Sequence, residues 1–206
     1  MDWDEVLDPA STPEEVLVEK IPAFHRSRLD DFRQFVSTSL IVSVEFIDEK
    51  EQYTLLLGPD EARCERGEMI DFPQATLRGS AGQWSRSLQL ASKLVVPADA
   101  QIDRYEGRVE LTEAIKSGFE QFDGVLEVAI CDLPDGGPSL EFDVVLNDYR
   151  PPEWAQKAQL VVQWSDLVDL AHGRISPVQM ARKTSVKGAV GLAFDIGGYL
   201  MREFDM

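Results

Sequence analysis

Apolar runs typical of β-strands occur in two separate parts of the chain. The first part has such runs at residues 40–47 and 52–57, and the second has them at residues 125–130 and 139–146. Turn-forming residues separate the two runs of each part, and the strongest separator is Asp135-Gly136-Gly137-Pro138. The pattern therefore predicts two antiparallel strand pairs.

The two strand pairs belong to a longer internal repeat. Asp31-Phe32-Arg33-Gln34-Phe35 precedes the first pair, and Gly118-Phe119-Glu120-Gln121-Phe122 precedes the second. The later matches are Ala75-Thr76-Leu77 with Ala158-Gln159-Leu160, Trp84-Ser85 with Trp164-Ser165, Pro97 with Pro177, and Gly107 with Gly188. All of them recur in one order at offsets of 80 to 87 residues. We therefore interpret the chain as two copies of one module, residues 28–111 and 112–206.

Residues 1–27, which precede the first copy, form an acidic leader with three prolines. This composition favours an extended arm, with one short helix that starts at residues 11–15, where a hydroxyl side chain, a proline and two acids match a helix N-terminus. Trp3 and the run Val16-Leu17-Val18 are costly to leave exposed. Two interpretations therefore stay open, a solvated tail and a docking segment for a partner.

Each copy is expected to contain a helix that ends in the Phe-x-x-Phe pair, two or three antiparallel strands, one further strand and two helices. In the second copy, apolar residues fall at helical spacing over residues 164–171, and His172-Gly173 supplies a stop. Ser176-Pro177 then supplies a helix start. Periodicity leaves the last boundary open, since residues 186–194 are compatible with a strand and residues from Gly198 onward with an amphipathic helix.

The second copy also carries a distinctive turn. It reads Gly173-Arg174-Ile175-Ser176-Pro177, and it follows a strand and a helix that begin near Ala158 and precedes Lys187-Gly188-Ala189-Val190-Gly191-Leu192-Ala193. This order resembles the C-terminal half of sterol carrier protein type-two (SCP2-like) domains, in which a strand, a helix, a Gly-Lys-Leu-Asp-Pro-like turn, a helix and a final strand follow one another. The resemblance covers residues 111–206 and, more weakly, residues 28–107.

The resemblance implies an α+β fold. It implies tandem modules, each a mainly antiparallel five-stranded sheet covered by helices on one face, with a hydrophobic tunnel between sheet and helices. Tunnels of this kind accept lipids, acyl chains or steroid-like molecules. Nothing in the resemblance implies catalysis, a cofactor or a metal.

The sequence departs from the family pattern at three places. Ala189 stands where the family usually has aspartate, and the first copy lacks the glycine of the turn before Pro97. Pro151-Pro152 occupies the region where the second copy should have a third strand, and a proline pair cannot lie inside a central strand. The first copy keeps a third strand at residues 61–65. We interpret the first copy as a degenerate partner of the second.

The candidates for a tunnel lining are apolar residues of the second copy. They are Phe142, Val144, Leu146, Trp164, Leu167, Met180, Leu192, Phe194, Tyr199, Leu200 and Phe204. Each is also explained as an ordinary core residue, and this alternative stays open. Residues 199–204 are expected to form a terminal amphipathic element that closes the cavity. Ligand binding would be driven by removing apolar surface from water, at about 25 cal/mol per Å².

Charge narrows the possible partners. The 206 residues include 37 acidic and 20 basic side chains, which gives a formal net charge of −17. A chain of this charge repels phosphate backbones, so nucleic-acid binding is not expected. A basic protein that binds the acidic leader is a possible partner instead.

Known catalytic and metal-binding patterns are not present in the sequence. Cys64 and Cys131 have no zinc-ligand spacing, and the two histidines lie near no nucleophile motif. His25 is expected to be solvated, and His172 to cap a helix. The chain starts with acidic residues, unlike a signal peptide, and has no run of about 20 apolar residues. We therefore expect a cytoplasmic protein without a membrane-spanning segment.

Two functions are consistent with these observations. The first is a non-catalytic carrier that holds a hydrophobic small molecule in an apolar tunnel and presents it to a partner enzyme. The second is a non-catalytic interaction subunit, in which the paired modules have filled cavities and the acidic leader binds a basic partner.

Overall fold

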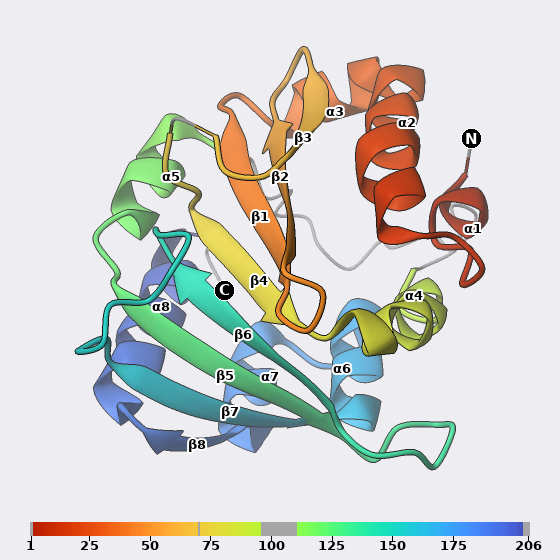
Figure 1. Cartoon of the computed structure of the whole chain (residues 1–206). Coiled ribbons are helices and arrows are strands. Elements are labelled where there is room, and N and C mark those ends of the chain that lie inside the picture. The colour runs from red at the N-terminus through yellow and green to blue at the C-terminus, as the bar shows by residue number, and fades with distance from the viewer. Residues whose placement is uncertain (1, 70, 96–110, 204–206) are drawn as a thin grey trace.

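The computed structural model describes residues 2–69, 71–95 and 111–203, and its strands form one sheet (Figure 1). The strands are β1 (Leu40–Phe46), β2 (Glu51–Leu57), β3 (Ala62–Arg66), β4 (Ala75–Gly79), β5 (Gly124–Cys131), β6 (Leu140–Leu146), β7 (Lys157–Gln163) and β8 (Ser185–Gly188). Within the described residues, their order across the sheet is β3-β2-β1-β4-β6-β5-β7-β8. Five of the seven neighbouring pairs are antiparallel, and β1–β4 and β5–β7 are parallel. The fold is therefore α+β with a mixed sheet.

The described residues of each half contribute four strands to this sheet, which differs from the two five-stranded sheets implied by the SCP2-like resemblance. The halves join where β4 pairs with β6, with Leu77 opposite Val144. The described residues between β6 and β7 contain Pro151-Pro152 and form no strand, as expected from the missing proline N–H groups. The predicted third strand of the first half is β3.

The two halves share one order of connections. In each half, a strand that comes after the strand pair lies parallel to the first strand of the pair, namely β4 beside β1 and β7 beside β5, and in the first half β3 comes between the pair and β4. A helix then begins at the matching tryptophan, Trp84 or Trp164. Pro97 and Gly107, which complete the repeat in the sequence, lie outside the described residues. The division at residues 111 and 112 stays a prediction.

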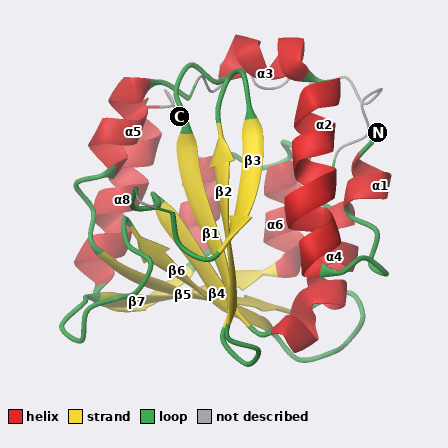
Figure 2. Cartoon of the chain, turned by 45° about the horizontal axis from the view of Figure 1, so that its top comes forward, coloured by secondary structure: helices red, strands yellow, loops and turns green. Residues whose placement is uncertain are grey.

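Figure 1 labels the α-helices, and two short turns of other helix types accompany them. They are α1 (Trp3–Val6), the π-helical turn η1 (Glu15–Lys20), α2 (Ile21–Ser27), α3 (Leu29–Phe35), the 3-10 turn η2 (Ala81–Gln83), α4 (Trp84–Ser92), α5 (Glu113–Phe119), α6 (Trp164–Ala171), α7 (Pro177–Lys183) and α8 (Val190–Glu203). Figure 2 shows α5 and α8 at one flank of the strands and α1, α2 and α4 at the other. Side chains from η1, α4, α6 and α8 pack on one face of the sheet.

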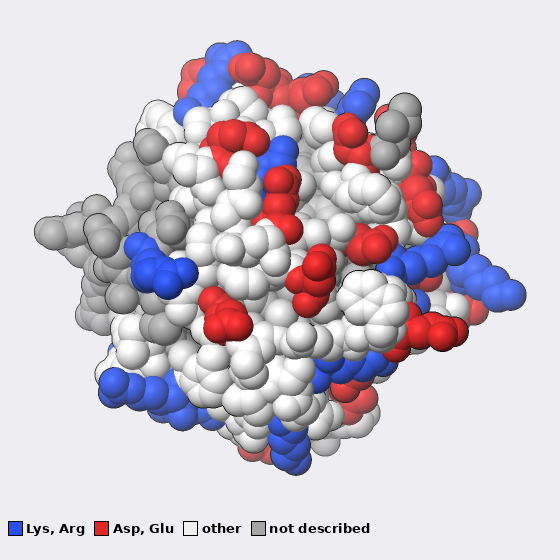
Figure 3. Space-filling model, turned by 90° about the vertical axis from the view of Figure 1, so that its left-hand side faces the viewer, with Lys and Arg blue, Asp and Glu red and all other residues white. Residues whose placement is uncertain are grey.

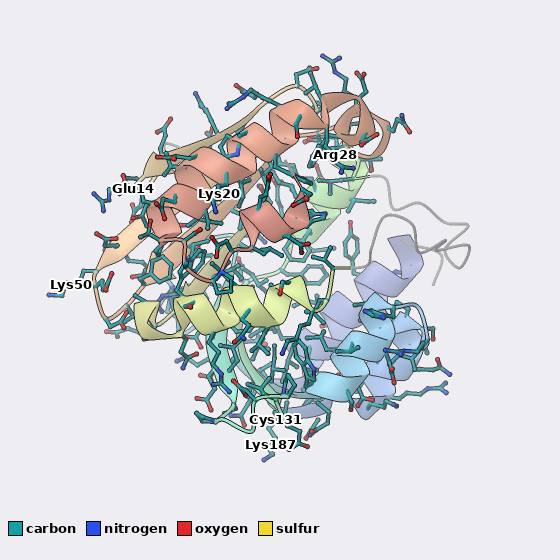
Figure 4. All side chains as sticks on the ribbon, turned by 90° about the vertical axis from the view of Figure 1, so that its right-hand side faces the viewer. Glu14, Lys20, Arg28, Lys50, Cys131 and Lys187 are labelled. Atoms are coloured by element: carbon teal, nitrogen blue, oxygen red, sulfur yellow. The ribbon has the colours of Figure 1, made fainter. Side chains whose placement is uncertain are left out.

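The leader is helical and packed, so the prediction of an extended or solvated arm was wrong. The predicted helix start is confirmed, because the Thr12 hydroxyl accepts a hydrogen bond from Glu15 N at 3.2 Å and the Glu15 carboxylate accepts one from Thr12 N at 2.7 Å. The helix then continues through η1 and α2, beside α4 (Figure 4). Val16 and Leu17 are buried in two core clusters. Their burial outweighs the acidic composition.

His25 is also buried, against the expectation that it is solvated. It is 1% exposed, and its Nε2 lies 2.8 Å from the carbonyl oxygen of Gly58. The ring packs against Phe32 with a centroid distance of 4.4 Å. The leader therefore covers the first half of the sheet.

The predicted strand, helix, turn, helix and strand order is confirmed in the second half by β7, α6, α7 and β8. Gly173 has a φ of 66°, which suits a helix stop at glycine, and Ser176 forms a capping box with Gln179. His172 ends α6 through its backbone N–H, and its buried ring Nε2 has no hydrogen-bond partner among the described residues. The boundary that the sequence left open lies between Gly188, where β8 ends, and Val190, where α8 begins.

The described residues cover the second face of the sheet only in part. Near one end of the strands, Thr54 donates a hydrogen bond to the carbonyl oxygen of Gly67 at 2.6 Å, and Thr76 donates one to that of Asp148 at 2.7 Å. Two connecting segments therefore lie on this face and bury both hydroxyls. Near the other end the face is open and polar. We call this part the open face, and it carries Glu45, Arg78, Glu127, Glu141 and Asp143.

Candidate functional site

Two of the predicted tunnel residues, Phe142 and Leu146, line the hollows described below, and a tunnel stays a prediction. Phe142, Trp164 and Leu167 pack in one core cluster with Leu90, Ile130 and Leu133. Val144, Leu146 and Leu192 pack in another with Ala158 and Ile196. Both clusters join sheet and helix side chains directly.

The remaining candidates are scattered. Met180 is 9% exposed and Tyr199 is 4% exposed, and the Tyr199 hydroxyl donates a hydrogen bond to the carbonyl oxygen of Ile115 at 2.8 Å. Tyr199 thereby fixes α8 to α5. Phe194 is 70% exposed and lies on the outside of α8. The side chain of Leu200 and the whole of Phe204 lie outside the described residues, so closure of a cavity by residues 199–204 stays a prediction.

A first hollow of about 390 Å³ lies where β4 ends between β1 and β6. Its lining consists of Ile47, Asp48, Arg78, Gly79, Ser80, Gln83, Glu141, Phe142 and Asp143. Of the predicted tunnel residues, only Phe142 takes part. Three carboxylates line a hollow that also has apolar walls.

Hydrogen bonds hold the polar groups of this hollow in place. Asp48 accepts hydrogen bonds from the Ser80 hydroxyl at 2.5 Å and from Ala81 N at 2.8 Å, and these bonds lower the pKa of Asp48 to about 2. Arg78 Nε lies 2.5 Å from Glu45 Oε2, so the only arginine of the lining is already paired. The buried Oε1 of Gln83 accepts no hydrogen bond from the described residues. The hollow therefore offers acceptors to a ligand that carries donors.

A second hollow of about 190 Å³ continues across the open face. It shares Glu141, Phe142 and Asp143 with the first hollow and extends to Glu127 on β5 and Gln159 on β7. Glu45, Arg78, Asp143 and Glu127 are neighbours across four adjacent strands. Burial raises the pKa of Asp143, and the negative charge of Glu127 raises it further. The strand register thus places three carboxylates near Arg78, and one of them, Glu127, also lies 3.8 Å from the ammonium of Lys157.

A third hollow, of about 400 Å³, lies beside the start of β5 and below an exposed tryptophan. We call it the Trp154 pocket. Its lining is Asp123, Gly124, Val145, Leu146, Asp148, Pro152, Trp154, Ala155 and Gln156. Trp154 is 79% exposed, although an exposed indole is unfavourable in water.

Local chemistry explains the shape of the Trp154 pocket. A turn closes where Ala155 N donates to the carbonyl oxygen of Pro152 at 2.9 Å, and Val125 N donates to that of Gln156 at 2.8 Å. Gly124 has a φ of 142°, and a Cβ there would lie 2.7 Å from the oxygen of Gln156. Sequence reasoning missed this pocket. The signal was a tryptophan two residues after a proline pair that interrupts the strand pattern.

Acidic side chains also shape the surface. Figure 3 shows acidic side chains among uncharged ones in the middle of one face, and long basic side chains that project from its lower and right margins.

The Cys64 thiol, whose pKa is raised to about 11 by burial, is protonated at neutral pH. No group of three or more His, Cys, Asp or Glu side chains within the described residues could hold a metal ion. No helix in that part of the chain is long and apolar enough to cross a bilayer.

No protein-family model, curated protein or solved structure was found to match this chain. The described hollows are therefore the basis for a functional proposal.

Proposed function

We propose that the protein is a non-catalytic interaction protein that binds a basic partner protein through the open face of its sheet. The observation that carries this proposal is the pair of connected hollows that share Glu141, Phe142 and Asp143. Their carboxylates outnumber their single arginine, which Glu45 already pairs. A formal net charge of −17 would attract a basic partner over a longer range.

The core packing supports the same proposal. Most of the residues expected to line a tunnel fill two core clusters instead. In this proposal the two tandem modules pair through β4 and β6 and support one continuous surface. The compartment we propose is the cytoplasm, since Cys64 and Cys131 are free thiols.

The test uses the full chain as bait in a lysate of the cells that produce it. The face variant Glu127→Lys/Glu141→Lys reverses two charges on the open face. The leader variant Asp4→Lys/Glu14→Lys makes the same change in charge on the leader (Figure 4). We expect the face variant to lose partners that the wild type and the leader variant retain, and salt to release those partners. Equal loss from both variants, or loss from neither, would contradict the proposal.

A carrier of a hydrophobic small molecule, presented to a partner enzyme, is the second candidate. One observation favours it: Leu77 of β4 lies on the helix-covered side of the sheet, opposite Val44 and Val144, and is 37% exposed. The SCP2-like resemblance of residues 173–177 also supports it. Native mass spectrometry of the purified protein should then show a bound apolar molecule. A bare mass, with no displacement of a fluorescent fatty acid, would reject the carrier.

A further inference from the structure

We propose that the Trp154 pocket binds a basic side chain, arginine in particular, of the partner protein. This inference rests on the proposed function and names the group that the protein recognises. It concerns a pocket separate from the two hollows of the open face, because their linings share no residue.

The pocket combines a firm base with an exposed aromatic wall. Val145 and Leu146, which line it from β6, are 1% and 2% exposed, so this part of the lining belongs to the core. Trp154 has no hydrogen bond and no ring contact within the described part of the chain, and the face of its indole is free to receive a ligand. Aromatic side chains that are exposed beside a cavity are typical of binding sites.

The carboxylates of the pocket have no cation of their own. Asp123 forms no ion pair or hydrogen bond among the described residues, and the Asp148 carboxylate accepts one hydrogen bond there, from Arg150 N at 3.2 Å. The guanidinium of Arg150 instead lies 3.0 Å from Glu68. The ammonium of Lys157 lies 3.8 Å from Glu127. Arg150 and Lys157 thus form ion pairs with acids outside the pocket, Glu68 and Glu127.

One cation can interact favourably with the indole of Trp154 and with the carboxylates of Asp123 and Asp148 at the same time. The face of an indole attracts a cation, and a carboxylate attracts it further. A guanidinium is planar, stacks on aromatic faces and donates two parallel hydrogen bonds to a carboxylate. Its propyl stem would lie against the ring of Pro152, another residue of the lining. These features favour arginine over lysine, and both over a neutral side chain.

The pocket is built before any ligand arrives. The Tyr149 hydroxyl accepts a hydrogen bond from Met69 N at 2.8 Å and lies 3.1 Å from the carbonyl oxygen of Asp71. Thr76 holds the main chain at Asp148, and Gln156 joins β5. The segment that carries Trp154 is thus fixed at both ends, which lowers the entropy cost of binding.

The test follows the indole N–H signal of Trp154 by NMR in the full chain. The signal is assigned by its loss in Trp154→Leu. The probes are N-acetyl-arginine amide, N-acetyl-lysine amide and N-acetyl-citrulline amide, whose side chain has nearly the shape of arginine without its charge. We expect the arginine probe to bind about tenfold more tightly than citrulline, with lysine between them. Equal binding of arginine and citrulline would overturn the inference.

Variants then locate the site. Asp123→Asn/Asp148→Asn should weaken binding of the arginine probe about tenfold, measured on the Trp154 signal. Phe194→Leu changes another exposed aromatic outside the pocket and should leave binding unchanged. A response that survives the double substitution, or that Phe194→Leu abolishes, would assign binding elsewhere.

Partner capture separates this inference from the proposed function. Trp154→Leu should release the same partners as the face variant Glu127→Lys/Glu141→Lys. Partners that leave the face variant but stay on Trp154→Leu would overturn the inference while the proposed function stands. If no partner depends on the open face, the proposed function fails, and the arginine probe still decides whether the pocket binds a cation.

Discussion

Arg86 of α4 and Asp135 of the β5–β6 connection form a bidentate ion pair. Arg86 Nε lies 2.7 Å from Asp135 Oδ2, and Arg86 Nη2 lies 2.9 Å from Asp135 Oδ1. The pair joins the helix that follows β4 to the strand pair of the second half. Its hydrogen bonds lower the pKa of Asp135 to about 2, from an ordinary value of 3.8.

Removal of this ion pair should destabilise the protein in a pH-dependent way. Because the pKa of Asp135 is lower in the folded state, its contribution is complete above pH 3.8 and disappears as the pH falls toward 2. Asp135→Asn should therefore unfold at a lower urea concentration than the wild type at pH 7. The difference should shrink between pH 4 and pH 2.

The control for this experiment is Glu49→Gln, which removes one exposed negative charge from the β1–β2 turn. In a chain with a formal net charge of −17, this change should leave stability unchanged or raise it slightly. Equal destabilisation by both substitutions at pH 7 would show that the ion pair contributes nothing.

The leader should contribute strongly to stability. Leu17 is 4% exposed and packs with Phe46, Tyr53 and Leu55 on the sheet. Leu17→Ala should lower the free energy of unfolding by about 2–4 kcal/mol, because it leaves a cavity in this cluster. Urea denaturation measures the loss. Glu19→Ala, on an exposed position of η1, should cost less than about 0.5 kcal/mol.

Limited proteolysis gives an independent result for the same segment. If the leader packs as the structure shows, it should resist cleavage in the wild type and become sensitive in Leu17→Ala. Rapid removal of residues 2–27 from the wild type, with no change in stability, would restore the interpretation as a solvated arm.

The sequence predicted local elements better than their assembly. Repeated landmarks such as Trp84 and Trp164, and the cap at Ser176-Pro177, depend on short-range chemistry, and the structure confirms them. The pairing of β4 with β6 depends on contacts far apart in the chain, and no local pattern predicts it. The prediction of an extended or solvated leader was wrong for a related reason. Its few apolar residues meet apolar partners from the sheet that composition does not reveal.

The candidate sites were harder to predict. The sequence pattern around apolar residues such as Trp164 and Leu192 is compatible both with a core and with a tunnel lining. In the structure both residues pack in core clusters. The hollows depend on strand register and loop path. Asp143 and Glu127 become neighbours only through the β5–β6 register. Trp154 and Asp123 line one pocket because β7, which follows Trp154, pairs with β5, which follows Asp123.

Gly124 should tolerate no side chain. Its φ of 142° is unfavourable for other residues, and a Cβ would lie 2.7 Å from the oxygen of Gln156 and 2.6 Å from Cδ2 of Leu192. Gly124→Ala should lower the free energy of unfolding by about 2–4 kcal/mol. Gly136→Ala is the matched control, because Gly136 also has a positive φ, 67°, but open space around it. It should cost about 1 kcal/mol. Equal losses in urea denaturation would show that the close approach to Gln156 is unimportant.

Thr76 should support the Trp154 pocket without lining it. Its side chain is completely buried, and its hydroxyl donates to the carbonyl oxygen of Asp148 at 2.7 Å. Thr76→Val keeps the shape but leaves that half-buried oxygen without its donor, so the free energy of unfolding should fall by about 1–2 kcal/mol. Thr76→Ser keeps the hydroxyl and removes a methyl group, at a cost of about 1 kcal/mol.

The two Thr76 variants should therefore separate stability from pocket geometry. Both are expected to lose similar stability, but only Thr76→Val frees the main chain at Asp148. Binding of N-acetyl-arginine amide, followed on the Trp154 indole signal under conditions where both variants are folded, should weaken in Thr76→Val and persist in Thr76→Ser. The same affinity in both variants would mean that the Thr76 hydrogen bond stabilises the fold without holding the pocket.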